Sequence, residues 1–309
     1  MNRNNLSDLF DTEDKITELS NNKVLIVDGN NLAMRTVFSI IFRNPEDQEQ
    51  DYKLWKHLFM NSIFSLITKF QPQRLILAFD SRNSWRYSVY QDYKLNRKAA
   101  KADSKLDFDK FFPIFEQLKT DFQNTFTNIP VFKVDRAEGD DIIAVISKKI
   151  IDRKYQVIIV STDKDFAQLL SQDNIRQFDP LKNTFIKNIN YKKDLEIKIL
   201  TGDVSDNIKP IRKGFGPKTA MKVLDEGTLL ELLEQPENIL MKENYTRNTT
   251  LINFDCIPKE IEENIVSKYN EYQYNPIEKT KLMQFFMKHN LNKLMLEWQN
   301  YSESVRELV

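Results

Sequence analysis

Acidic residues gather in residues 137–150, AEGDDIIAVISKKI, more densely than the start of a helix requires. One carboxylate at a helix N-terminus complements the helix dipole and caps free N–H groups. Here Glu138, Asp140 and Asp141 fall within four positions, directly before an apolar run. Like charges this close repel by about 4 kcal/mol near a protein surface, so the triplet needs positive charge from elsewhere. Carboxylates without histidine or cysteine favour hard cations such as Mg²⁺, with Mn²⁺ as a substitute.

The elements that would position these acids can be predicted from the apolar pattern. Short runs rich in β-branched residues predict buried strands at 23–28, 74–80, 130–135, 156–161 and 175–179. Segments of helical period lie between them at 52–70, 108–122, where Pro113 would interrupt the helix, and 139–151. This alternation predicts an α/β fold with a mostly parallel central sheet flanked by helices. Beyond residue 188 the pattern predicts helices only, at 193–200, 218–224, 228–233, 261–272 and 279–293.

Carboxylates follow each of the first four predicted strands. The carboxyl ends of parallel strands share one edge of a sheet, where such folds build their sites. An aspartate after a single strand is more often a cap or turn former, but repetition after four strands favours a shared site. The set is too large for one ion and fits the two-metal arrangement of phosphodiester cleavage. The predicted metal ligands are Asp28, Asp80, Glu138, Asp140, Asp141, Asp163, Asp165, Asp203 and Asp206.

Two segments carry the positive charge that a nucleic acid would need. Residues 82–105 hold seven basic residues against two acidic ones, interleaved with aromatic residues, although a solvated face is the commoner origin of such a run. Residues 209–222, KPIRKGFGPKTAMK, hold five basic residues and glycines that permit a tight hairpin before a helix start. The predicted nucleic-acid contacts are Arg82, Arg86, Tyr93, Lys98 and Lys101 in the first segment and Lys213, Gly214, Gly216, Lys218 and Thr219 in the second.

Composition excludes several other classes of protein. The 309 residues include 45 basic and 45 acidic ones, so attraction to a polyanion must come from local segregation of charge. A single cysteine excludes an internal disulfide and a cysteine-clustered metal site, and two histidines argue against histidine chemistry. No signal peptide or apolar span is apparent, so we expect a soluble cytoplasmic protein. We expect a loose tail at 1–20, an α/β catalytic domain at 21–187 and a helical DNA-binding domain at 188–309.

The motifs together resemble a known family. VLIVDGNN, LAFD, YKLNRK, EGDDIIAV, STDKDFAQLL, TGDVSDN, GFGPKTA and, more weakly, LINFDCIP occur in order within residues 21–290. Each is modest alone, but their order resembles the 5′ nuclease superfamily of flap endonucleases, and within it the branch found in T-even bacteriophages. The resemblance implies a PIN-like 5′ nuclease fold, followed by a smaller all-helical domain that contains a helix-hairpin-helix-like element.

The resemblance also implies roles for individual residues. It divides the acids into a first metal site of Asp28, Asp80, Glu138, Asp140 and Asp141 and a second of Asp163, Asp165, Asp203 and Asp206. It implies that Lys94 and Arg97 act as catalytic contacts to the scissile phosphate from a helical arch, and that Tyr93 stacks on a base. The glycine hairpin would hold the duplex and bind a monovalent cation. The span from Arg97 to Asp107 is short, which leaves open whether a 5′ strand is threaded or clamped.

We therefore expect a monomeric Mg²⁺-dependent 5′ to 3′ exonuclease and flap endonuclease with ribonuclease H activity. It would act on DNA and RNA–DNA duplexes with 5′ ends, flaps or forks, and remove RNA primers and adjoining DNA from lagging-strand fragments. If the chain is encoded by a phage, we expect it in the host bacterial cytoplasm. A sliding clamp and a single-stranded DNA-binding protein are candidate partners. Leu6, Leu9 and Phe10 form either a clamp-docking peptide or part of a frayed terminus.

Two alternatives from other classes stay open at this point. One is a non-catalytic junction-binding protein whose acids are structural. The other is a phosphatase with an aspartyl nucleophile after the first strand. That chemistry normally needs a second aspartate two residues later, where Asn30 stands, so the phosphatase is disfavoured.

Overall fold

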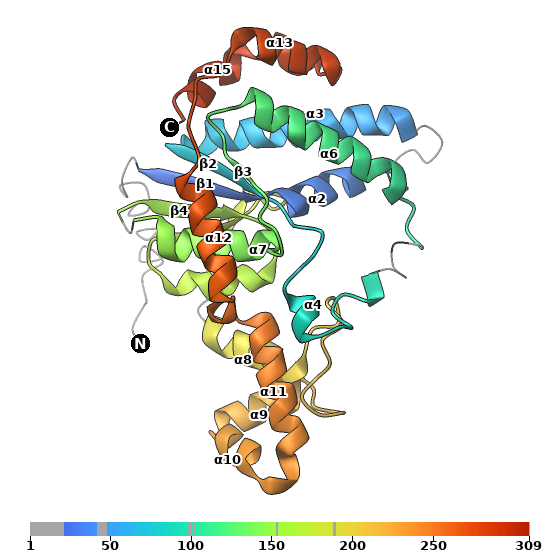
Figure 1. Cartoon of the computed structure of the whole chain (residues 1–309), viewed down its shortest axis with the longest axis vertical. Helices are drawn as coiled ribbons and strands as arrows, with labels where there is room; N and C mark the ends of the chain where they lie inside the picture. Colours follow the sequence, from blue (N-terminus) through green and yellow to red (C-terminus); the bar gives the residue numbers. More distant parts are fainter. Residues whose placement is uncertain are drawn as a thin grey trace, which may run out of the picture.

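A mostly parallel sheet forms the centre of the molecule (Figure 1). The structure is a computed structural model that describes residues 22–41, 48–97, 101, 103–152, 154–187 and 190–308. Within these residues six strands pair in the order β3-β2-β1-β4-β5-β6. All neighbours are parallel except β5 and β6. The strands are β1 (Lys23–Asp28), β2 (Arg74–Ala78), β3 (Val131–Phe132), β4 (Gln156–Val160), β5 (Ile175–Asp179) and β6 (Thr184–Ile186). The expected α/β architecture is confirmed, and β6 was not predicted.

The central strand β1 is buried on both faces, which explains its unbroken apolar run. Leu25 and Val27 pack into the core on one side of the sheet, and Val24 and Ile26 pack into the core on the other. A strand covered on both faces shows no alternation of polar and apolar residues. Its pairing with β2 and β4 brings Asp28 beside Ala78 and Val27 beside Val160, so the ends of the three strands lie level.

Three helices cover the first face of the sheet: α2 (Gly29–Ile41), α3 (Gln48–Phe70) and α6 (Phe108–Thr125) (Figure 1). Aromatic rings dominate this core, with Trp55 packed edge-on against Phe111 and Phe115. Helix α6 begins at its cap Asp107, which accepts hydrogen bonds from the N–H groups of Asp109 and Lys110. It continues through Pro113, so the predicted interruption is wrong. Burial of the aromatic face outweighs the hydrogen bond that proline removes.

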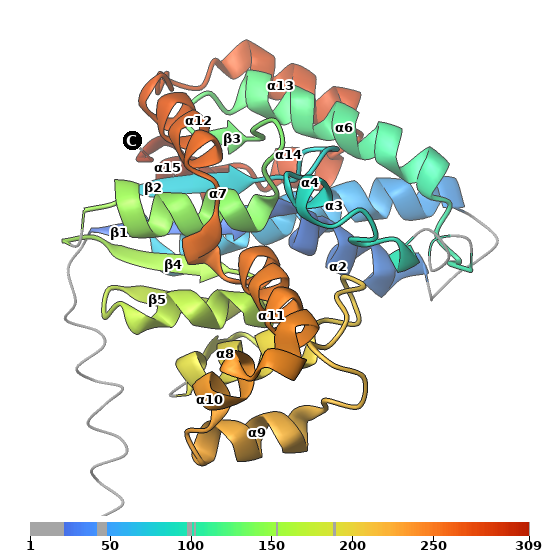
Figure 2. The same ribbon diagram turned by 60° about the horizontal axis from the view of Figure 1, so that its bottom comes forward.

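The second face is covered by α7 (Gly139–Val145), which continues into the π-helical turn η1 (Ile146–Ile150), by the 3₁₀ helix η2 (Lys164–Ser171) and by α12 (Lys259–Asn270) (Figure 2). The apolar run of α7, Ile142 to Val145, is fully buried against the sheet. The three acids that precede this run are thereby brought to the carboxyl edge of the strands.

A separate helical unit lies below the sheet in Figure 1. It contains α8 (Tyr191–Thr201), α9 (Pro217–Asp225), α10 (Leu229–Glu234), η3 (Pro236–Asn238), α11 (Ile239–Ile252) and η4 (Phe254–Cys256). Leu200, Ile211, Phe215, Leu233 and Met241 form a small core of its own.

After this unit the chain returns to the α/β body. Helix α12 packs on the second face of the sheet, and α13 (Lys279–Lys288), α14 (Asn292–Leu296) and α15 (Gln299–Arg306) join the core of the first face (Figure 1). Phe285 and Trp298, for example, pack against Phe126. The last part of the segment expected at 188–309 therefore shares its core with the α/β body, because helical period alone does not reveal which surface an apolar stripe meets. The expected tail at 1–20, with Leu6, Leu9 and Phe10, lies outside the described residues.

No helix within the described ranges is long and apolar enough to cross a bilayer.

Candidate active site

One cavity collects most of the predicted metal ligands. It has a volume of about 530 Å³ and lies where β1, β2 and β4 end and α7 begins. Lys94 and Arg97, the predicted phosphate contacts, line the same cavity. Its carboxylate lining is formed by Asp28, Asp80, Glu138, Asp140 and Asp163.

Asp28 is held at the end of β1 by two donors. Its Oδ1 accepts the N–H of Asn31 at 3.0 Å, and its Oδ2 accepts the Ser161 hydroxyl at 3.0 Å. Ser161 also accepts the N–H of Asp163, so one hydroxyl connects the end of β1 with the loop that follows β4. Burial, aided by the charge of Asp80, raises the pKa of Asp28 to about 7 despite these hydrogen bonds. A cation near Asp28 would stabilise its ionised form.

Asp80, just beyond β2, is fixed by its neighbours on both sides. Its Oδ2 accepts the Asn30 side-chain amide at 2.9 Å, and its Oδ1 accepts the N–H of Gly139 at 2.7 Å. A Cβ at Gly139 would lie 3.1 Å from that Oδ1, so the absence of a side chain permits the close approach. Burial raises the pKa of Asp80 above its ordinary value.

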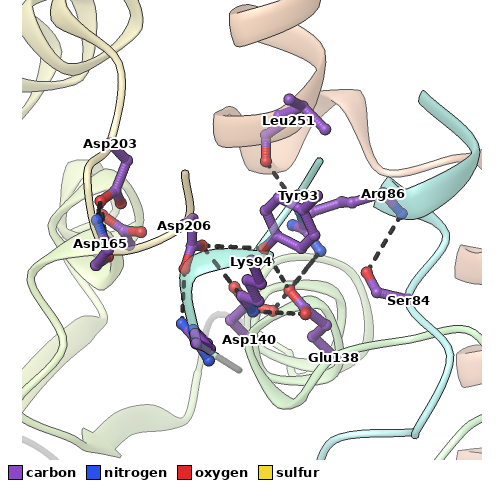
Figure 3. Close-up of polar contacts among 12 residues, drawn as sticks. Ser84, Arg86, Tyr93, Lys94, Glu138, Asp140, Asp165, Asp203, Asp206 and Leu251 are labelled. Atoms are coloured by element: carbon purple, nitrogen blue, oxygen red, sulfur yellow. Dashed lines mark hydrogen bonds and ion pairs between the residues drawn. The ribbon is translucent and has the colours of Figure 1, made fainter. Parts of the chain in front are cut away.

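Glu138 is shared among three donors (Figure 3). Its Oε1 lies 2.5 Å from the Lys94 ammonium, and its Oε2 accepts the Tyr93 hydroxyl at 2.9 Å and the Arg86 guanidinium at 3.2 Å. Burial raises the pKa of Glu138, but the charges of Lys94 and Arg86 outweigh burial and hold it below its ordinary value. Burial lowers the pKa of Lys94, and Glu138 in turn holds it above its ordinary value.

The structure gives Arg86 and Asp141 roles that differ from those predicted. Both are buried: Arg86, in α4 (Arg86–Val89), is 2% exposed and Asp141 is 0% exposed. The guanidinium donates to both oxygens of Asp141 at 2.8 and 3.0 Å, and Trp85 donates to Asp141 at 3.0 Å. Asp141 therefore has no oxygen facing the cavity, and Arg86 has no surface to offer a nucleic acid. The sequence pattern cannot distinguish a buried arginine from an exposed one in a basic run.

A second group of carboxylates surrounds Lys198. Its ammonium pairs with Asp165 and lies 2.7 Å from Asp203 (Figure 3 labels both acids). Burial raises the pKa of Asp165, whereas at Asp203 the charge of Lys198 outweighs burial and lowers the pKa. Lys198 was not among the predicted residues, since it lies in α8 among other lysines without a distinguishing pattern.

Asp206 lies between the two groups. Its carboxylate accepts Arg97 at 2.6 Å and the Tyr93 hydroxyl at 3.0 Å, and the Lys94 ammonium is 3.9 Å away (Figure 3). The loop that carries it begins at Gly202, whose φ of 72° suits glycine and whose Cβ would lie 2.2 Å from the carbonyl oxygen of Ile208.

The loop at 203–207 is also fixed to the start of the predicted arch. The Lys94 N–H donates to the carbonyl of Asp206 at 2.9 Å, and the amide side chains of Asn96 and Asn207 each bond a carbonyl across the same junction. The junction places the cations of one segment beside the acids of the other.

Ammonium groups, rather than carboxylates alone, fill the immediate surroundings of these acids. Among the described residues no three carboxylate, histidine or cysteine side chains stand in a geometry that could hold a metal ion as they are placed. Lys94 forms an ion pair with Glu138, and Lys198 forms ion pairs with Asp165 and Asp203. The acids that line the cavity nevertheless suit a hard cation, because all five offer only oxygen ligands. Their negative charges are also costly to bury unless a positive charge lies nearby.

The other predicted nucleic-acid contacts are distributed unevenly. Tyr93 is 2% exposed and its hydroxyl is engaged, so it offers no ring face for a base. Arg82 is exposed, and together with Lys101 it lines an adjoining cavity of about 810 Å³. Lys98 lies outside the described residues.

The predicted glycine hairpin precedes a helix start as expected. Pro217 occupies the first position of α9 and Gly216 its cap, and Gly214 has a φ of 79°. Lys213, Lys218 and Thr219 are exposed around this helix N-terminus.

Polar residues that position the acids were missed at the sequence level. Asn30 and Asn31 could have been found, since both follow β1 directly, as the acids do. Gln177 could not, because it lies within β5, where it is 0% exposed and donates to the carbonyls of Ser161 and Asp163.

Comparison with known proteins decides the family. Residues 23–203 match the family model described as 5′-3′ exonuclease, N-terminal resolvase-like domain. The chain belongs to the 5′-3′ exonuclease family. Residues 190–301 match a second family, described as T4 RNase H, C terminal. The predicted resemblance is thereby confirmed, and with it membership of a metal-dependent family of 5′ nucleases.

Curated and solved relatives agree with this assignment. The chain is 29% identical over 304 residues to ribonuclease H of Enterobacteria phage T4, covering 92% of this chain and 98% of the relative. It is 30% identical over 230 residues to flap endonuclease Xni of Psychromonas ingrahamii, covering 70% and 81%. The fold resembles that of the bacteriophage T5 D15 flap endonuclease in a complex with DNA and metal ions, with a TM-score of 0.64, 23% identity, and coverage of 81% and 98%.

Proposed function

We propose that the chain is a Mg²⁺-dependent 5′ to 3′ exonuclease and flap endonuclease with ribonuclease H activity. It cleaves phosphodiesters at 5′ ends, flaps and forks of DNA and RNA–DNA duplexes, with Mn²⁺ able to replace Mg²⁺, and removes RNA primers and adjoining DNA from lagging-strand fragments. One observation carries the proposal: five carboxylates line a single cavity together with the cations of Lys94 and Arg97. The same cavity thus holds carboxylates that suit metal ions and cationic side chains that suit a phosphate.

We assign the metal ligands to two groups. Asp28, Asp80, Glu138, Asp140 and Asp163 form the first, and Asp165, Asp203 and Asp206 form the second. Asp141 is left out because its carboxylate is bonded to Arg86 and Trp85. A pair of divalent ions at such groups supplies Lewis-acid activation of the attacking water and of the leaving oxygen.

The chain's own residues orient and neutralise the substrate phosphate. Lys94 and Arg97 line the cavity and now pair with Glu138 and Asp206. A phosphate that enters the cavity competes for these cations, and the carboxylates so released become available to metal ions. The ion pairs of Lys94 and Arg97 therefore balance the negative charge of Glu138 and Asp206 as long as neither substrate nor metal is bound.

The helical unit from α8 to η4 supplies the duplex grip in this proposal. Lys213, Lys218 and Thr219 surround the N-terminus of α9, which favours an anion and reads no base sequence. Binding of a monovalent cation at the glycine hairpin stays a prediction. So do a monomeric state and docking to a sliding clamp or a single-stranded DNA-binding protein.

A cleavage assay tests the proposal. A duplex with a labelled 5′ flap, made once with DNA and once with RNA at the 5′ end, is incubated with Mg²⁺, with Mn²⁺, or with chelator. We expect short labelled products with either metal and none with chelator. Asp163→Asn should abolish cleavage while duplex affinity is retained, since asparagine keeps the cap that Asp163 gives to the N–H of Asp165.

The outcomes separate an enzyme from a binding protein. Duplex binding without products under any metal condition would favour a non-catalytic junction-binding protein and reject the proposal. Equal loss of binding and cleavage in Asp163→Asn would remove that residue from the catalytic group.

A further inference from the structure

Two fully buried side-chain amides lie beside the loops that carry Asp165 and Asp203. They belong to Gln177 of β5 and Asn248 of α11, and both residues are 0% exposed. Burial of an amide costs free energy unless hydrogen bonds within the protein replace those to water. Both amides donate to main-chain carbonyls. The carbonyls that they reach therefore indicate what the two side chains do.

Gln177 fixes the turn by which the chain leaves β4. Its Nε2 donates to the carbonyl of Ser161 at 2.9 Å and to the carbonyl of Asp163 at 2.5 Å. Asp163 in turn caps the N–H of Asp165 through its Oδ1 at 2.9 Å. The side chain of Asp163 lines the cavity of about 530 Å³, whereas that of Asp165 pairs with Lys198. One amide therefore holds the turn from which an acid reaches each of the two groups.

Stability does not explain the burial of Gln177. Its Oε1 has no hydrogen-bond partner among the described residues, and an unpaired buried acceptor costs free energy. Ile175, two residues earlier on the same face of β5, packs into an apolar core. An apolar side chain at residue 177 would avoid the cost, but it would remove the donor that holds the carbonyls of Ser161 and Asp163.

Asn248 fixes a loop of the helical unit in the same way. Its Nδ2 donates to the carbonyls of Ile199 and Lys209, both at 2.9 Å. These carbonyls flank residues 203–208, which carry two acids of the second group and close into a loop through two hydrogen bonds between their first and last members. Asn248 therefore joins the two ends of this loop.

The second group depends on both loops because its acids come from two parts of the chain. Asp165 follows β4 of the α/β body, whereas Asp203 and Asp206 follow α8 of the helical unit. The two loops meet at Lys198, whose ammonium pairs with Asp165 and lies 2.7 Å from Asp203 (Figure 3 shows the two acids). Mg²⁺ demands near-ideal octahedral geometry with oxygen ligands at about 2.1 Å. A small displacement of either loop would therefore weaken binding of an ion between them.

We propose that Gln177 and Asn248 are positioning residues that set the spacing of the carboxylates for the second metal ion. The inference rests on the proposed function and adds to it two residues that contact neither an ion nor the substrate. Gln177 also acts on the first group, because Asp163 lies on the turn that it holds. Asn248 acts on the second group alone. The two amides thus differ in a way that ion binding can measure.

Titration with Mn²⁺ in the absence of substrate tests the proposal. Electron paramagnetic resonance of the free ion gives the number of bound ions and their dissociation constants, and we expect two ions for the wild-type chain. Asn248→Leu should weaken binding of one ion by about 10- to 100-fold and leave the other unchanged, since groups that orient metal ligands have effects of this size. Gln177→Met keeps the length of the side chain without a donor and should weaken binding of both ions.

Two other amides provide matched controls. Asn174 donates to the carbonyl of Tyr155 at 3.1 Å, at the opposite end of the same pair of strands. Asn244 donates to the carbonyl of Ile211 at 3.0 Å from the preceding turn of α11. Asn174→Leu and Asn244→Leu each remove a partly buried amide that holds a main-chain carbonyl outside the two acidic loops. Both variants should keep the two dissociation constants of the wild-type chain.

A measurement on the wild-type chain decides the matter even if the variants do not fold. Because linkage is reciprocal, an ion whose binding depends on the amide contacts must in turn stabilise those contacts. Addition of Mg²⁺ should therefore slow hydrogen exchange of the side-chain amide protons of Gln177 and Asn248, as followed by NMR. The corresponding protons of Asn174 and Asn244 should exchange at nearly unchanged rates.

Three results distinguish the possibilities. Weaker binding of one ion in Asn248→Leu, of both in Gln177→Met and of neither in the controls supports the positioning role. If the wild-type chain cleaves the labelled flap and binds two ions but all four variants bind Mn²⁺ alike, the role is rejected and the proposed function stands. Where the variants do not fold, unchanged exchange at Gln177 and Asn248 on addition of Mg²⁺ rejects it likewise. If the wild-type chain neither binds Mn²⁺ nor cleaves with any metal, both fail.

Discussion

A buried arginine organises the acids at the start of α7. Arg86 donates to both oxygens of Asp141. It also donates to Glu138, and its Nε donates to the carbonyl of Leu251 at 2.9 Å, at the end of α11 (Figure 3). One guanidinium thus joins the carboxylate cluster to the helical unit. The planar guanidinium has five N–H donors in a fixed fork, so it can contact both oxygens of Asp141 while it also donates to Glu138 and Leu251. A lysine ammonium has three donors and no such fork, so it cannot replace the arginine.

Removal of this arginine should unfold the protein more readily. We expect Arg86→Met to lower the free energy of unfolding by about 3–5 kcal/mol, because it leaves the buried carboxylate of Asp141 without a compensating positive charge. Addition of Asp141→Asn should restore part of the loss by removing the unpaired charge. Urea denaturation of the single and double variants measures both effects. Arg82→Met, at an exposed position nearby, is the control and should change stability by less than about 0.5 kcal/mol.

An equal stability of Arg86→Met and the wild-type chain would contradict the structural role given to Arg86.

Lys94 is the cation best placed to act on a phosphate. Its φ of 56° is unusual for a residue other than glycine, and its side chain is 13% exposed within the cavity that the acids line. We expect Lys94→Ala to lower the single-turnover cleavage rate by at least about 100-fold, the effect of losing one preorganised charge. Fluorescence anisotropy should show nearly unchanged duplex affinity. A normal rate in this variant would remove Lys94 from the site.

At the scale of elements, the strands were the most predictable part. β1 and β5 match their predicted bounds. For β1 the reason is that a strand buried on both faces carries an unbroken apolar signal. Helix α2 was missed since it opens with Gly29, Asn30 and Asn31, which are typical of a turn. The edge strand β6 is three residues long and only partly buried, so it leaves no pattern to detect.

The acids of the site were predictable because they follow parallel strands, whose carboxyl ends lie at the same edge of the sheet. Asp28, Asp80, Glu138, Asp140 and Asp163 do line one cavity. What the sequence could not supply was the direction of each side chain: it does not reveal that Arg86 turns inward to Asp141. Nor does helical period separate Phe108 and Phe112, which border the cavity, from the core residues beside them.

Helix α13 is tied to α6 by a contact that should respond to pH. The Nε2 of His289 lies 2.9 Å from the Oδ2 of Asp121. Burial, with the charge of Lys56, lowers the pKa of His289 below its ordinary value despite this contact. As the pH falls, His289 takes up a proton at about pH 6.5 in the unfolded chain but only at a lower pH in the folded chain. Its contribution to the free energy of unfolding is therefore lost as the pH drops from that value through the folded pKa.

Between about pH 7.5 and about pH 5.5, the melting temperature of the wild-type chain should therefore change less favourably than that of His289→Asn. Asp28, whose pKa of about 7 favours the folded chain as the pH falls, contributes the opposite trend equally in both proteins. Burial raises the pKa of Asp121, but hydrogen bonds from Lys288, Gln117 and His289 outweigh burial and hold it below its ordinary value, so Asp121 stays charged throughout this interval. Differential scanning fluorimetry of both proteins at the two pH values measures the difference. An equal change of melting temperature in both proteins would show that His289 does not contribute.

At the scale of the whole molecule, a chain of zero net charge must bind a polyanion through separate local surfaces. Lys94 and Arg97 face the cavity on the α/β body, and Lys213 and Lys218 lie on the helical unit. The first pair would act on the phosphate that is cut, and the second on the duplex behind it. Such a division predicts that cleavage and duplex affinity can be altered independently.

Charge reversal on the helical unit tests this division. Lys213→Glu combined with Lys218→Glu should weaken duplex binding and flatten its dependence on salt by about one unit of slope for each phosphate that is no longer neutralised. The cleavage rate at saturating enzyme should change little, because the cavity is untouched. Lys293→Glu, an exposed lysine of α14, is the control. A reduced rate at saturation with unchanged affinity would contradict the division.

The central claim is that carboxylates at the carboxyl edge of the sheet hold a pair of divalent ions. Anomalous X-ray scattering from crystals soaked in Mn²⁺ tests it most directly. We predict two peaks, one among Asp28, Asp80, Glu138, Asp140 and Asp163, and one among Asp165, Asp203 and Asp206, with Lys94 and Lys198 turned away from their present partners. A map with no peak among these side chains, or with its peaks elsewhere on the molecule, would contradict the account.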